Sequence, residues 1–164
     1  MKAKIKRTTL ISALVVASIA SCASALSVTD ATSPVSQQNV KICKTIDNAK
    51  NAPRSYSYEF KAKESGLTGL PKTQTINFED ITDGLTKCID VDLSSVAFAD
   101  NTPKQIEVEV TESIINGLGE NSTSYSILFD LHETYDKKSN PVGRVVSVFL
   151  HDASGAKVNQ FDFE

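Results

Sequence analysis

Three cysteines, Cys22, Cys43 and Cys88, are the residues best suited to covalent chemistry. Cys43 and Cys88 are isolated and lack the paired short spacings that zinc sites use, so metal ligation is disfavoured. Two thiols in an oxidising compartment usually join, so we predict a Cys43–Cys88 disulfide, with two buried free thiols as the alternative. Closing a loop of about 46 residues would stabilise the fold by about 4 kcal/mol.

Two histidines, His132 and His151, could hold a divalent metal or act as a pH switch if they are neighbours. They lie in two segments that we expect to form one β-hairpin. If paired residue numbers in that hairpin sum to 283, the imidazoles face each other. If they sum to 281, His132 faces Phe149 instead. We expect ordinary surface histidines and no metal.

Acidic residues form the other polar group, with Asp90 and Asp92 in one expected strand and Glu107 and Glu109 in another. If these strands pair, calcium could relieve the repulsion between their carboxylates. Flat strands rarely wrap an ion in six or more oxygens, so we expect solvated faces.

Catalytic signatures are missing from the sequence. It contains no Gly-x-Ser-x-Gly elbow, Walker loop, dinucleotide fingerprint or His-Glu-x-x-His motif. We therefore expect a protein that is not an enzyme and needs no cofactor.

The first 25 residues have the composition of an export signal. Four cations precede an uncharged run from Leu10 to Ile19, and small residues follow. A run of about ten residues is too short to cross a hydrocarbon core of roughly 30 Å as a helix. We expect this segment to direct export and then to be removed.

The end of this segment, Ile19-Ala20-Ser21-Cys22, resembles the lipobox of bacterial lipoprotein precursors. The resemblance implies that Cys22 receives a lipid and becomes the new N-terminus, and Ala23 after it implies sorting to the outer membrane. Cleavage after Ala25, at the Ala23-Ser24-Ala25 site, is the alternative and would release a soluble periplasmic or secreted protein. The predicted division is a signal at 1–21, a flexible Ser/Thr-rich tether at 22–39 and one domain at 40–164.

The expected mature chain is acidic. The leader holds four of the 17 Lys and Arg and none of the 20 Asp and Glu, which leaves 13 cations against 20 acids, or about −7. Such a chain repels nucleic-acid phosphates and anionic lipid headgroups, and it has no basic stripe interleaved with aromatics. We therefore expect a protein partner, membrane contact only through the lipid anchor, and no nucleic acid.

Periodicity predicts the elements of the domain. Val40, Cys43, Ile46 and Ala49 recur at helical spacing, which predicts one short N-terminal helix that the disulfide would pin to the strand of Cys88. The remainder alternates with a period of two. We predict a mainly β domain, an antiparallel β-sandwich or curled sheet of about seven strands. Their inward residues lie at 56–60, 76–78, 89–93, 106–110, 125–131, 146–150 and 161–163.

A turn at Ser154-Gly155 would set the register of the last hairpin, with Val148 opposite Phe161. The segment Ser154-Gly155-Ala156-Lys157 resembles the Ser-Gly-x-x loop of bacterial C-type lysozyme inhibitors. Val158 stands where that family has a tyrosine, so no site residue transfers.

Two functions follow as expectations. The first is a lipid-anchored, non-catalytic module that uses a sheet face or edge to bind another envelope or surface protein. The alternative is a secreted or periplasmic inhibitor or effector that acts on a hydrolase or a host protein.

Overall fold

A computed structural model describes residues 37–114 and 123–164. The predicted signal, Cys22 and most of the predicted tether lie outside these ranges. The described residues form strands and no helix, and so contain no helix of sufficient length and apolar character to span a membrane. The mainly β class is therefore confirmed. The strands are β1 (Asn39–Thr45), β2 (Ser55–Ala62), β3 (Leu67–Thr68), β4 (Thr73–Asn77), β5 (Thr86–Asp92), β6 (Ala97–Phe98), β7 (Lys104–Ile114), β8 (Ser124–Tyr135), β9 (Pro141–His151), β10 (Lys157–Val158) and β11 (Phe161–Phe163).

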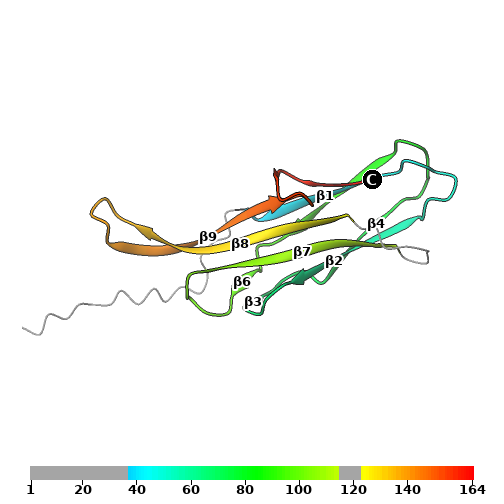
Figure 1. Cartoon of the computed structure of the whole chain (residues 1–164). Coiled ribbons are helices and arrows are strands. Elements are labelled where there is room, and N and C mark those ends of the chain that lie inside the picture. The colour runs from blue at the N-terminus through cyan, green and yellow to red at the C-terminus, as the bar shows by residue number, and fades with distance from the viewer. Residues whose placement is uncertain (1–36, 115–122) are drawn as a thin grey trace, which may run out of the picture.

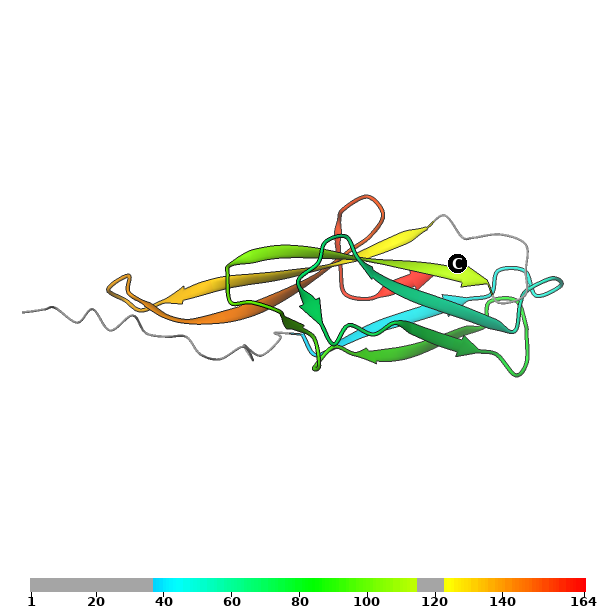
Figure 2. The same cartoon turned by 90° about the horizontal axis from the view of Figure 1, so that it is seen from below.

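Two main sheets make up the described structure (Figures 1 and 2). The larger has six strands in the order β10-β9-β8-β7-β2-β4, and every neighbouring pair in it is antiparallel. The smaller has the order β11-β1-β5, in which β1 is antiparallel to β5 and parallel to β11. Strands β3 and β6 form a separate two-stranded ladder.

The hydrophobic core lies between the two main sheets. Tyr58 of the large sheet contacts Phe163 of the small sheet with ring centroids 4.9 Å apart, and Tyr125 stacks on Phe161 at 4.7 Å. These side chains face one another because alternate residues of a strand point to the same face. Each aromatic ring buried in this way contributes a large apolar area to the core.

The predicted N-terminal helix is wrong, because Asn39–Thr45 is strand β1. Val40 and Ile42 point into the core at 0% exposure, while Lys41 and Asn39 are exposed. The apolar residues of this short segment fit both a helical and a strand period. What decides is tertiary context: β1 lies between β11 and β5, which pair with its backbone on both sides.

The predicted last hairpin is also wrong. After the turn, β10 pairs with β9 through Val158 and Leu150, and the chain then crosses to the small sheet. There Phe161 pairs with Ile42 of β1 in the parallel sense. Phe161 and Phe163 are core residues, as predicted, but they fill the core from the opposite sheet.

The β8–β9 hairpin keeps the predicted faces but not the predicted register. Phe129 pairs with Val148, so paired numbers sum to neither 281 nor 283. The turn is centred earlier than expected, where Asp136 N–H donates to the Asn140 carbonyl at 2.9 Å. Strand β7 begins only opposite Leu131, so residues 132–145 extend past it as a two-stranded ribbon, here called the hairpin arm (Figures 1 and 2).

Candidate functional site: a polar pocket beside a buried ion pair

A buried ion pair joins the two sheets. Lys44 follows Val40 and Ile42 on the inward face of β1, and Glu112 follows Val108 and Val110 on the inward face of β7. The Lys44 Nζ lies 3.1 Å from the Glu112 Oε1, and the two side chains are 6% and 1% exposed. Charges removed from water this far are found almost only in pairs, because an isolated one would lose its hydration energy.

Two tyrosines surround this pair. The Lys44 Nζ lies 4.6 Å from the centroid of the Tyr56 ring, within the range of a cation–π interaction. Burial, followed by the charge of Glu112, raises the pKa of both Tyr56 and Tyr58 above the ordinary 10.0. The Tyr58 hydroxyl is buried and donates no hydrogen bond within the described parts of the chain. The cluster is held neutral in total, with one cation, one anion and two protonated phenols.

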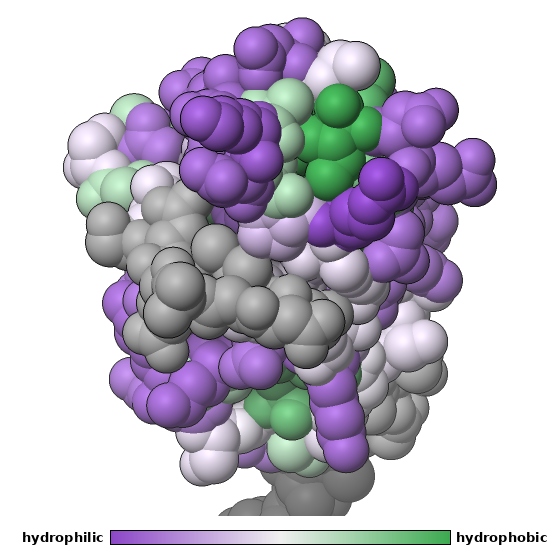
Figure 3. Space-filling view, turned by 90° about the vertical axis from the view of Figure 1, so that its right-hand side faces the viewer, coloured by the Kyte–Doolittle hydropathy of each residue, from purple (hydrophilic) through white to green (hydrophobic). Residues whose placement is uncertain are grey.

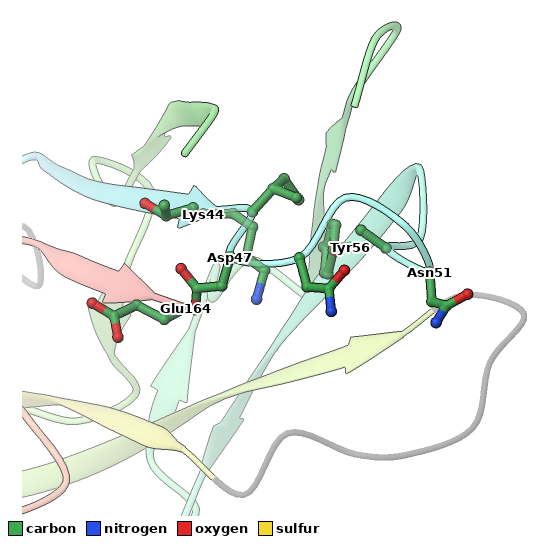
Figure 4. Close-up of a pocket in the computed structure, with 9 residues that line it drawn as sticks. Lys44, Asp47, Asn51, Tyr56 and Glu164 are labelled. Atoms are coloured by element: carbon green, nitrogen blue, oxygen red, sulfur yellow. The ribbon is translucent and has the colours of Figure 1, made fainter. Parts of the chain in front are cut away.

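A pocket of about 310 Å³ opens beside the ion pair, at the end of the molecule where β1 and β11 finish (Figure 4). Apart from Lys44, most of the residues that line the pocket are polar, and most belong to the loop after β1. Figure 3 views this end, which is mainly hydrophilic with small hydrophobic patches. The residues that line the pocket are Lys44, Thr45, Ile46, Asp47, Asn48, Asn51, Ala52, Tyr56 and Glu164.

The chemistry of this pocket suits binding. Its lining contains neither histidine nor cysteine, and its one ammonium is already neutralised by Glu112. The side chains of Asp47 and Asn51 are exposed at its mouth, where the carboxylate can accept hydrogen bonds from a polar ligand and the amide can both donate and accept them. Tyr56 supplies an aromatic wall.

The Cys43–Cys88 disulfide is present in the structure. The two residues are directly opposite in neighbouring antiparallel strands, with Cα atoms 4.0 Å apart. Both point away from the core, because Ile42 and Lys44 on either side of Cys43 point inward. The bridge therefore ties strand β1, and not a helix, to β5 on the outer face of the small sheet.

The two histidines do not meet. His132 pairs with Val145 and His151 pairs with Ser126, because the turn is centred earlier than either predicted register requires. The His132 Nδ1 lies 3.7 Å from the Asp130 Oδ2, and its side chain is 43% exposed. No group of three or more metal-ligating side chains occurs within 37–114 and 123–164.

The acidic strands do not pair either. Asp90 and Asp92 belong to β5 in the small sheet, and Glu107 and Glu109 belong to β7 in the large sheet. Glu107 instead binds Lys63 at 2.9 Å, and this hydrogen bond lowers the pKa of Glu107. The geometry behind a shared calcium site is therefore absent.

A second pocket, of about 200 Å³, lies on the outer face of the large sheet. Asp152, Ala153 and Gly155 of the β9–β10 turn form one side of it, and Lys63 and Glu107 lie in its wall. The Asp152 carboxylate fixes this turn by accepting hydrogen bonds from Ser154 and from the Ala156 N–H. The turn that resembles the lysozyme-inhibitor loop therefore borders a polar hollow.

Comparison with protein-family models, with curated proteins and with solved structures finds no match to this chain.

Sequence reasoning missed the ion pair, although the alternation contained a signal for it. Ile106, Val108 and Val110 lie on the core face of their strand, and Glu112 continues the same parity. A charged residue at an inward position requires an inward partner of opposite charge. Lys44 could not be proposed as that partner while its segment was expected to be a helix.

Proposed function

We propose that this chain is an exported protein of the bacterial envelope, anchored in the outer membrane by a lipid on Cys22. Its described domain would serve as a non-catalytic module that binds another envelope or surface protein. The observation that carries the proposal is the Cys43–Cys88 bridge on an outer sheet face, because disulfides persist in oxidising compartments. The leader and the lipobox-like tetrapeptide support the same location.

We further propose that the two main sheets constitute a β-sandwich. Contacts between the sheets, such as Tyr58 with Phe163 and Lys44 with Glu112, support this class. A sandwich leaves loops at both ends for recognition. The pocket lined by Asp47 and Asn51 lies at one such end.

The anchor is tested by comparing the natural chain with Cys22→Ser in a bacterial host. We expect the natural protein to fractionate with membranes and to gain the mass of acyl chains, and the variant to be soluble. Equal masses and equal release of the two proteins would contradict the anchor and favour cleavage after Ala25.

Crosslinking to a tagged chain in its native cell, followed by capture, then identifies the protein partner.

The second candidate is an inhibitor or effector that inserts a loop into a hydrolase. It is favoured by the rigid, exposed turn at Ser154-Gly155 beside the second pocket. Purified protein should then slow lysozyme, and Ser154→Ala should weaken that effect. Unchanged lysozyme activity at excess protein would remove this version.

A further inference from the structure

The tip of the hairpin arm differs in chemistry from the rest of the described surface. Tyr135 and Val142 are the two exposed large hydrophobic residues within 37–114 and 123–164, at 58% and 56% exposure. They lie at the ends of paired strands, on either side of the turn. Lys137 and Lys138, in that turn, are exposed, and no ion pair of either is present among the described residues.

The carboxylates of the arm are engaged by the arm itself. Glu133 accepts a hydrogen bond from the Tyr135 hydroxyl at 2.6 Å and lies 3.5 Å from the Arg144 guanidinium. Asp136 accepts hydrogen bonds from the Lys138 and Asn140 N–H groups and from the Asn140 side chain. These hydrogen bonds hold the turn in one shape. Asp136 is also exposed and keeps its negative charge, so the arm as a whole, with Lys137, Lys138 and Arg144 against Glu133 and Asp136, carries a net charge of +1.

The arm projects from the end of the domain where the described chain begins. Lys44, at the far end of β1, contacts Glu112, and β7 near Glu112 pairs with the start of β8. Asn39, at the near end of β1, therefore lies toward the end of β8, from which the arm extends (Figures 1 and 2). A tether that leads from a membrane to Asn39 would bring this end of the domain toward that membrane.

We propose that the hairpin arm is a second membrane contact, which places Tyr135 and Val142 among the headgroups of an anionic bilayer and Lys137 and Lys138 against lipid phosphates. This inference rests on the proposed anchoring at Cys22. Tyrosine suits the interfacial layer because its ring is apolar and its hydroxyl stays hydrated.

The acidity of the whole chain does not prevent this contact. Charges further apart than a Debye length, about 10 Å at 0.1 M salt, are largely screened from one another. The bilayer at the tip therefore meets the net positive charge of the arm, three cations against two acids, before it meets the acids of the sheets. The contact should weaken as salt is raised.

The test uses the exported chain carrying Cys22→Ala, after leader removal, so that no acyl chain contributes. We expect it to cosediment with vesicles of phosphatidylcholine mixed with phosphatidylglycerol and not with phosphatidylcholine alone. Each lysine near an anionic surface contributes about fivefold to binding, so Lys137→Glu with Lys138→Glu should weaken it by at least about twentyfold. The matched control is Lys50→Glu with Lys72→Glu, which makes the same charge change at two exposed lysines outside the arm and should bind nearly as well.

A fluorescence measurement reports insertion of the hairpin arm directly. The chain contains no tryptophan, so an introduced one is the only indole that emits. Tyr135→Trp should show a blue-shifted emission on the anionic vesicles, whereas Lys72→Trp should not. Equal binding by the arm and control charge variants, or an unshifted Tyr135→Trp, would overturn the proposal. So would crosslinking of the tip to a protein without vesicle binding. Failure of acylation at Cys22 would leave these vesicle results readable, so the two proposals can fail separately.

Discussion

At the scale of single residues, the Lys44–Glu112 pair is a buried ionic contact between the two sheets. It is a charged contact in an otherwise apolar layer, and each partner is positioned by the alternation of its own strand. Such a pair adds little stability over a well-packed apolar pair, but the loss of one partner leaves a buried charge. The loss of one partner should therefore cost more stability than the intact pair contributes.

Removal of one partner should be costly. We expect Lys44→Met or Glu112→Gln to lower the free energy of unfolding by about 3–5 kcal/mol, measured by urea denaturation. The double variant Lys44→Met with Glu112→Leu should recover most of that loss, because no buried charge remains. The control is Lys63→Met, whose partner Glu107 lies at 2.9 Å in an exposed pair and should matter by less than about 1 kcal/mol. A Lys44→Met cost no larger than that of Lys63→Met would show that the buried pair is not structurally important.

At the scale of elements, the disulfide acts on two strands that already pair. It lies on the outer face of the small sheet, so the core does not depend on it for packing. Its contribution comes from restricting the unfolded chain over a sequence separation of 45 residues.

Reduction should therefore weaken the fold without abolishing it. We expect Cys43→Ala with Cys88→Ala to lower the free energy of unfolding by up to about 4 kcal/mol and to retain the far-ultraviolet signal of a β protein. Urea denaturation and circular dichroism measure the two effects. Loss of the β signal without denaturant would mean that the bridge is needed to form the small sheet.

Two glycines with similar left-handed backbone conformations, Gly69 and Gly84, can be compared by substitution. Gly69, at φ +69°, follows β3, and a Cβ there would lie 1.9 Å from the Ser95 carbonyl oxygen. Gly84, at φ +76°, would meet nothing within 4 Å. Gly84→Ala should cost about 1 kcal/mol for the left-handed conformation alone, and Gly69→Ala clearly more, measured as a difference in urea midpoint. Equal costs would mean that the Ser95 segment yields freely.

The alternation of apolar residues predicted seven of the eleven described strands and which of their side chains face the core. Tyr58, Phe129 and Val148 are examples, all of them buried. Local pattern could not predict pairing between strands that are far apart in the chain. The parallel β1–β11 ladder joins Ile42 to Phe161, residues that are far apart in the chain. The two-residue strands at Leu67 and Ala97 are too short to show any period.

Of the features described with the candidate site, the sequence predicted only the Cys43–Cys88 disulfide. Cys43 and Cys88 could be paired because few pairings were possible, whereas the pocket depends on how the loop around Asp47 folds back over Tyr56. Side chains meet there from both sheets. The position of the β8–β9 turn sets a register in which His132 and His151 do not pair. That position depends on hydrogen bonds to Asp136 that the strand pattern does not encode.

At the scale of the whole molecule, the two ends differ. One end carries the arm and the start of β1, and the other carries the pocket and the end of β11 (Figures 1 and 4). If the arm and the proposed anchor face a membrane, the pocket with Asp47 and Asn51 faces away from it. A protein partner of the pocket would then approach from the side opposite the bilayer.

The tyrosines report the integrity of the whole fold at alkaline pH. Burial raises the pKa of Tyr56, Tyr58 and Tyr125 above 10.0, and the hydrogen bond to Glu133 raises that of Tyr135. A raised pKa means that the folded state holds its proton more tightly than the unfolded state does. The resulting stability is present below pH 10 and is lost as the pH rises further.

We therefore expect phenolate absorbance to appear at higher pH in the folded protein than in urea, with its main rise coinciding with loss of the β signal. All four tyrosines contribute and no tryptophan interferes. Tyr135→Phe removes the one exposed phenol and should leave the main rise in place, since that rise comes from the three rings packed between or beside the sheets. Titration near pH 10 with the β signal intact would instead show that these rings are reached by solvent without unfolding, and that the two sheets separate more easily than their packing implies.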